Sequence, residues 1–118
     1  MHIDATSFGS ITIDGARYGH DVVVHLSGNI VKRRKKLSKK RHGTSHIISE
    51  DEVRFVFAKG CEAMVVGTGQ MGLARLSEEA GEFLKRKGCE VVARPTPEAV
   101  EAFNQLKSPK TGLFHVTC

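Results

Sequence analysis

The chain has 118 residues, of which 40% are hydrophobic and 26% are charged. This composition predicts one globular domain over residues 1–118 and excludes a disordered chain. No apolar run approaches the roughly 20 residues of a membrane span, and the N-terminal residues lack the blocks of a signal peptide. The sequence therefore predicts neither a membrane protein nor a secreted one.

The net charge of +5 comes from one segment. Eight of the ten residues at 32–41 are basic, and the remainder of the chain has ten basic residues against 13 acidic ones. The basic residues are Lys32, Arg33, Arg34, Lys35, Lys36, Lys39, Lys40 and Arg41. Eight cations could contact nucleic-acid phosphates. The segment has no aromatic residue to stack on bases, and the chain has no Trp and one Tyr, so a solvated loop or an oligomer contact is favoured.

The three cysteines, Cys61, Cys89 and Cys118, are 28 and 29 positions apart and include no C-x-x-C pair. This spacing matches neither a disulfide framework nor a zinc signature. We expect a reducing, cytoplasmic location, no metal and no cofactor.

The first third of the chain has the alternation of β-structure. Residues 11–13, 21–26 and 30–31 are predicted as strands, and the turns between them are predicted at 14–15 and 27–29. The pattern indicates an antiparallel meander.

From Ser49 the period becomes helical. Ser49 and Glu52 have the spacing of a capping box, and Gly60 is the predicted end of the helix. The apolar residues 63–66 follow, which predicts a strand covered on both faces.

A repeat follows: residues 59–65 return 28 positions later as residues 87–93, and both copies predict a helix that ends before a buried strand. The helix before the second copy, at 78–87, is predicted to be capped by Ser77.

A last helix is predicted from Thr96 as N-cap and Pro97 as first residue, and a last strand over 111–117. The elements together predict a three-layer α/β domain whose mixed central sheet contains parallel βα units and is preceded by an antiparallel β meander. The carboxyl ends of such strands form the ligand crevice. Residues 43–46, 67–69 and 94–96 are therefore expected to meet at one rim.

The candidate ligand-binding residues at this rim are His46, Gly67, Thr68, Gly69, Arg94 and Thr96. They could bind a small anion or form a cryptic enzyme site. Residues 67–72 also match the G-x-G-x-x-G pattern, but the predicted helix cap, Ser77, lies eight residues beyond Gly69, so a dinucleotide site is rejected. His25 and His115 are interpreted as structural, and a capping or packing role is favoured for His46. Cys118 would be a poor nucleophile unless its end of the chain were pinned.

Several short motifs together resemble one known family: Ile13-Asp14-Gly15, Gly43-Thr44-Ser45-His46, Val66-Gly67-Thr68-Gly69, and Gly112 to Cys118. The chain is similar to a small-domain family of archaeal and bacterial hypothetical proteins. Its animal members include the adipogenesis-associated domain protein and a mitochondrial respiratory complex I assembly factor. The resemblance implies a three-layer α/β fold and a role in protein contacts, with Asn104, His115 and Cys118 as pattern residues of open role. The chain departs from this pattern at 32–41, where several relatives have a tryptophan.

The sequence thus favours a non-enzymatic cytoplasmic binding or assembly module over an enzyme. The expected contact surface combines the basic segment with residues 67–69, and a protein is the expected partner. A small-anion pocket at Gly67–Gly69 and Arg94 is the alternative, and nucleic-acid binding through 32–41 is the third hypothesis. The oligomeric state is left open.

Overall fold

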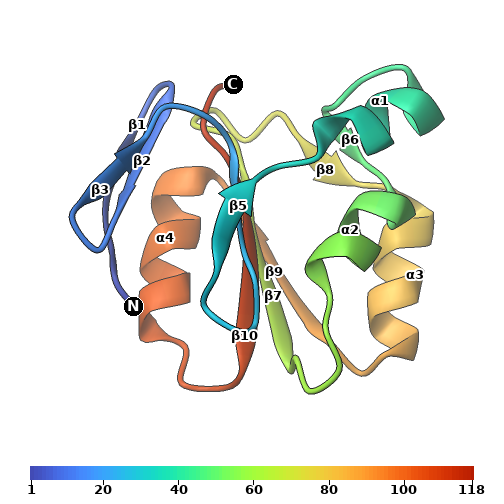
Figure 1. Cartoon of the computed structure of the whole chain (residues 1–118). Helices are drawn as coiled ribbons and strands as arrows, with labels where there is room; N and C mark the ends of the chain where they lie inside the picture. Colours follow the sequence, from blue (N-terminus) through green and yellow to red (C-terminus); the bar gives the residue numbers. More distant parts are fainter.

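The computed structural model describes residues 1–118 and has a central sheet between two layers (Figure 1). The sheet has the strand order β5-β4-β10-β7-β9. Its strands are β4 (Val22–Val24), β5 (Ile30–Lys32), β7 (Ala63–Thr68), β9 (Glu90–Arg94) and β10 (Lys110–His115). β4 is antiparallel to β5 and β10, whereas β10, β7 and β9 are parallel. The predicted three-layer α/β fold with a mixed sheet is confirmed.

The predicted meander divides between two sheets. β1 (Ile3–Ser7), β2 (Ser10–Ile13) and β3 (Ala16–Tyr18) form a separate antiparallel sheet, while β4 and β5 extend the central one. β1 was not predicted, because only Ile3 of its five residues is buried and the others show no apolar alternation.

Helices cover both faces of the central sheet. α4 (Thr96–Gln105) lies on one face with the β1–β3 sheet, and α2 (Glu50–Val56) and α3 (Glu78–Arg86) lie on the other (Figure 1). The short parallel strands β6 (Ile47–Ile48) and β8 (Arg75–Leu76) pair above them.

The alternating side chains of the central strands fill two separate cores. Val23 and Met64 belong to the α2–α3 core, and Val22, Val24 and Val65 belong to the α4 core. Every residue of β7 is buried, as the prediction of a strand covered on both faces requires. The prediction that β9 is also buried is wrong, because β9 is an edge strand with exposed residues.

Ser49 is the N-cap of α2 as predicted, but the reciprocal bond of the capping box and the end of the helix need correction. Ser49 caps α2 by accepting the Glu52 N–H at 3.2 Å, but the Glu52 side chain does not return to Ser49, whose N–H is bonded by Ser38 Oγ instead. α2 ends at Val56 rather than near Gly60, since Phe57 is extended and packs its ring edge-on against Phe83.

The basic segment is mostly a helix and not a solvated loop. α1 (Lys35–His42) ends on Gly43, whose left-handed φ of 75° lets its N–H bond the Lys39 carbonyl. Lysine and arginine are good helix formers, and cations suit the last turn of a helix. No helix of the chain is both long and apolar enough to cross a bilayer.

Candidate functional site

The carboxyl ends of β7 and β10 meet the start of α4 at one rim, and Thr96 connects them. Thr96 Oγ1 accepts the Gly69 N–H at 2.9 Å and donates to the His115 carbonyl at 2.5 Å. The Thr96 N–H bonds the Gly69 carbonyl at 2.9 Å. The predicted meeting of 67–69 with Thr96 is therefore observed, but Thr96 is not an N-cap: Pro95 precedes the helix and Thr96 lies inside it.

His46 joins this rim from the loop before β6, as the sequence predicts for residues 43–46. Its Nε2 lies 3.6 Å from Cys118 Sγ, and its ring is 5.5 Å from that of His115 at an angle of 69°. One ligand atom from each of His46, His115 and Cys118 lies within 4.8 Å of the other two. The sequence pattern favoured a structural role for His115, the family resemblance left the roles of His115 and Cys118 open, and neither placed the two residues beside His46.

The segment that carries Cys118 is held by backbone hydrogen bonds. The Gln70 N–H bonds the Thr117 carbonyl at 2.6 Å, and the Leu73 N–H bonds the Cys118 carbonyl at 3.1 Å. Cys118 is half-buried. Cys118 therefore has a fixed place at the rim.

Gly67 and Gly69 are required by close packing rather than by a ligand. A Cβ on Gly67 would lie 2.8 Å from Thr96 Oγ1, and one on Gly69 would collide with the Cys118 backbone. Both glycines are buried and the Gly69 N–H is already bonded. The prediction that residues 67–69 offer free amides to an anion, or form part of a contact surface, does not fit this arrangement.

The Arg94 side chain lies apart from His46, His115 and Cys118. It is exposed on edge strand β9 and lines a shallow hollow with Glu90, Ala102 and Gln105 on the α4 face. Side chains alternate along a strand, so Glu90 and Arg94 share the side that faces α4. The structure does not bring Arg94 to His46 or Cys118.

A buried ionic network supports His115 from behind. Asp21 accepts from His115 Nδ1 at 2.8 Å and from Arg33 at 3.0 Å. Arg33 Nε donates to Glu52 at 2.6 Å, and Ser38 Oγ donates to the same carboxylate at 2.5 Å. Arg33 was predicted as part of the basic surface, and this is wrong: its side chain has no exposed area.

The network holds Asp21 in its charged form. Burial alone would raise the pKa of this carboxyl, but hydrogen bonds from His115, from the Val116 N–H and from Arg33 lower it to about 2. Burial likewise opposes the charge of Arg33, and Glu52 and Asp21 reverse that effect and raise the pKa of the guanidinium. No sequence signal distinguished Arg33 from its basic neighbours, while Asp21 stood out only as the polar residue before a valine run.

Asn104 and the other cysteines have structural roles. The Asn104 amide accepts the Ile3 N–H and donates to the Ile3 carbonyl, both at 2.9 Å, and so joins α4 to β1. The repeat of 28 residues brings Cys61 and Cys89 side by side, with 3.8 Å between the sulfurs. Burial and the neighbouring Cys61 raise the pKa of Cys89 to about 12.

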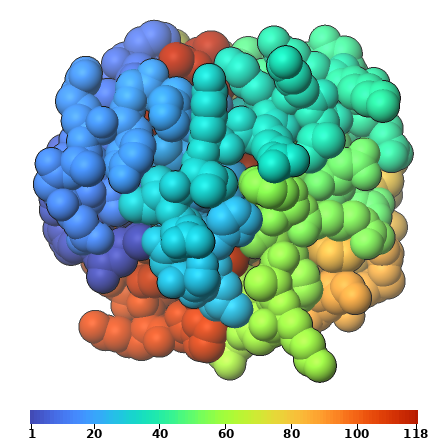
Figure 2. All heavy atoms as spheres, viewed as in Figure 1, coloured from blue at the N-terminus to red at the C-terminus, as the bar shows by residue number.

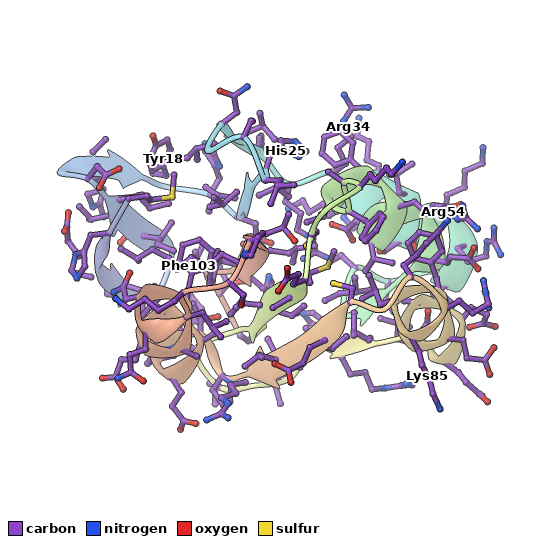
Figure 3. All side chains as sticks on the ribbon, turned by 90° about the horizontal axis from the view of Figure 1, so that it is seen from below. Tyr18, His25, Arg34, Arg54, Lys85 and Phe103 are labelled. Carbon is purple, nitrogen blue, oxygen red and sulfur yellow. The ribbon has the colours of Figure 1, made fainter.

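The largest hollow of the surface lies beside the basic helix. It has a volume of about 650 Å³ and lies between β5, the start of α1 and Phe55 of α2. Val31, Leu37 and Phe55 supply its apolar part. The Arg34 guanidinium stacks over the Phe55 ring at 4.4 Å, and Figure 3 shows Arg34 beside α1 and α2. We call this hollow the α1 groove.

The border of the α1 groove, on a different part of the surface from the rim with His46, is basic. Lys32, Arg34, Lys35 and Lys36 line it and are all exposed. Figure 2 shows the cyan atoms of β5, the blue-green atoms of α1 and the green atoms of α2 meeting on one face. Positive charge and apolar area are therefore adjacent there.

Comparisons with known proteins agree with this fold. Residues 3–112 match a family described as "Protein of unknown function (DUF498/DUF598)". The chain is 36% identical to the conserved hypothetical protein PH1505 from Pyrococcus horikoshii OT3, with 100% of both chains covered and a TM-score of 0.93. It is 28% identical to a protein called MT938, with 99% and 98% covered and a TM-score of 0.86. A Mth938-like domain from Bordetella pertussis has the same fold at 19% identity, with 98% of this chain and 85% of that chain covered and a TM-score of 0.64.

Proposed function

The chain belongs to the DUF498/DUF598 family of proteins of unknown function, and we propose that it is a protein-binding module whose α1 groove takes an acidic segment with apolar side chains. The observation that carries the proposal is the basic rim around an apolar floor in the α1 groove. An acidic partner is favoured because opposite charges steer encounter and fix orientation. Apolar anchors in a hollow supply most of the affinity of such contacts.

The first turn of α1 adds to this preference. It has no acidic residue, and its N-cap, Arg34, makes no side-chain cap. The first backbone N–H groups of a helix point outward and favour a negative group. A carboxylate of the partner at the groove would complement both these amides and the lysines.

A role in assembly fits the resemblance of the sequence to the adipogenesis-associated domain protein and the complex I assembly factor. The proposed surface is narrower than the sequence suggested, since Gly67–Gly69 are buried under Cys118 and Thr96 and the contact is assigned to the α1 groove alone. A reducing, cytoplasmic location suits the three free cysteines.

Fluorescence anisotropy with short labelled peptides tests the proposal. Peptides that alternate Asp or Glu with Leu or Phe should bind, and peptides with Lys in place of the acidic residues should not. The variant K32E/K35E/K36E should weaken binding at least about tenfold, or 1.4 kcal/mol. Phe55→Ala should weaken it while leaving the charge unchanged.

The matched control is K59E/K85E/K107E, which makes the same charge change at exposed lysines outside the groove. Lys85 lies on α3, away from Arg34 (Figure 3). Equal losses in the two triple variants would reduce the effect to net charge and overturn the proposal. Tighter binding of single-stranded DNA than of any peptide, lost with K32E/K35E/K36E and falling steeply with salt, would replace it with nucleic-acid binding.

A further inference from the structure

We infer that His46, His115 and Cys118 form a binding site for one zinc ion at the rim, with a fourth coordination position open. Imidazole and thiolate are the ligands that Zn²⁺ prefers, and three protein ligands with a free position are typical of an open zinc site. The three residues come from the loop before β6, from the end of β10 and from the segment after it. The sequence offered no zinc signature because His46 lies 72 positions before Cys118, so only the fold brings it to the other two ligands.

The spacing of the ligand atoms fits a tetrahedral ion. With Zn–N near 2.05 Å and Zn–S near 2.3 Å, tetrahedral ligands are about 3.6 Å apart for N and S and about 3.3 Å for two N. Cys118 Sγ and His46 Nε2 are already 3.6 Å apart. The full set spans at most 4.8 Å, so the atom pairs that include His115 need to close by no more than about 1.5 Å to reach one ion.

Asp21 sets up His115 as a ligand. It accepts from Nδ1 at 2.8 Å, which leaves the Nε2 lone pair to act as an acceptor. The Thr117 hydroxyl now donates to Nε2 at 3.2 Å, and a zinc ion would take the place of this hydrogen bond. Cδ2 of the His115 ring packs against Gly69: a Cβ added to Gly69 would lie only 2.9 Å from this atom. A carboxylate behind a histidine ligand is the arrangement that orients imidazoles in zinc proteins.

The surroundings favour a cation and permit its entry. Behind the site one guanidinium, Arg33, faces two carboxylates, Asp21 and Glu52, so the network carries an excess of negative charge. His46 and Cys118 are partly exposed. The backbone bonds of Gln70 and Leu73 hold Cys118 in place before any ion arrives.

Binding of the metal alone tests the inference. Titration of the reduced full chain with Zn²⁺ in a calorimeter should give one site per chain with proton release. Co²⁺ in its place should show tetrahedral absorption and a thiolate-to-cobalt charge-transfer band. Cys118→Ser should abolish that band, and His46→Ala should weaken Zn²⁺ binding at least tenfold. Asp21→Asn should weaken it about 10- to 100-fold.

Two controls separate this site from other donors. His42→Ala removes a histidine of α1 outside the cluster and should bind Zn²⁺ as the unaltered chain does. Cys89→Ala removes one sulfur of the buried pair and should keep the cobalt band. A band lost in Cys89→Ala but kept in Cys118→Ser, or equal Zn²⁺ affinity in the unaltered chain, Cys118→Ser and His46→Ala, would overturn the inference. The triple variant K32E/K35E/K36E should retain zinc, so this test is independent of peptide binding.

Discussion

Arg33 and Glu52 form an ion pair with no exposed side-chain surface on either partner, and 2.6 Å separates Arg33 Nε from the carboxylate. A second bond, from Arg33 Nη2 to the other carboxylate oxygen at 3.0 Å, makes the pair bidentate. Arg33 also donates to Asp21 and to the Ser45 carbonyl. Ser38 donates its hydroxyl to Glu52. The pair therefore connects the end of β5 with α2 and with the loop before β6 that carries Ser45 and His46.

Removing one partner of this pair should be far worse than removing both. Arg33→Met leaves the buried Glu52 carboxylate without its main donor, and we expect a loss of about 3–5 kcal/mol in the free energy of unfolding. The double variant R33M/E52L should recover part of this loss. Urea unfolding of the two single variants and the double variant gives the coupling. Arg54→Ala breaks the exposed pair with Glu50 and should cost less than about 1 kcal/mol; a loss for Arg33→Met no greater than this would contradict the expectation.

Acid should remove the stabilisation that comes from Asp21. Its folded pKa of about 2 lies below the unfolded value of 3.8, so the contribution is present above pH 3.8 and disappears as the pH falls toward 2. The difference between these values corresponds to about 2 kcal/mol. Urea unfolding of the metal-free protein between about pH 6 and pH 2 measures this loss of unfolding free energy.

Asp21→Asn provides the comparison for this pH dependence. The variant should be less stable at neutral pH, because His115 and Arg33 lose a charged acceptor. Its stability should also fall less steeply below pH 4 than that of the unaltered chain, about where Asp21 titrates. Parallel curves for the two proteins would show that other carboxyls dominate.

The same Gly→Ala change should have opposite effects at two positions. At Gly69 the backbone has a φ of 108° and a Cβ would strike the Cys118 backbone, so we expect a loss above about 2 kcal/mol in unfolding free energy. At Gly81, inside α3, a Cβ meets nothing within 4 Å, and alanine should add about 0.4–1 kcal/mol. Thermal unfolding of both variants is the measurement, and equal effects would contradict the packing argument.

Periodicity and capping residues were enough to predict the layers, because they act over a few neighbouring positions. The buried strand around Met64, the Ser77 cap and the helix after Pro95 all follow from local pattern, and the topology of parallel strands explains why Thr96 meets Gly69. The meeting of His46 with Cys118 could be expected only in part. Residue 46 was placed at the rim, but nothing local directs the end of β10 past Gly69.

Arg33 shows the opposite limit of sequence reasoning. A basic run reads as a solvated surface, and seven of its eight members agree with this interpretation because they are exposed. Arg33 precedes α1 and turns inward, because Asp21 and Glu52 from distant segments are there to receive it. The prediction that Arg94 lies at the rim is wrong for a related reason. The local pattern predicts the strand, whereas the pairing register decides which face of the sheet a side chain occupies.

Asn104 should control how firmly the small β1–β3 sheet is held. Its amide makes two hydrogen bonds to the Ile3 backbone, and we expect Asn104→Ala to cost about 1–3 kcal/mol. Because β1 has a single buried residue, Ile3, the loss should appear first as local opening. Amide hydrogen exchange should speed up in β1 and β2 while the β7 and β10 amides keep their protection. Gln105→Ala, at the exposed neighbouring position of α4, is the control and should leave β1 unchanged; uniform acceleration across both sheets would show that the two sheets unfold together.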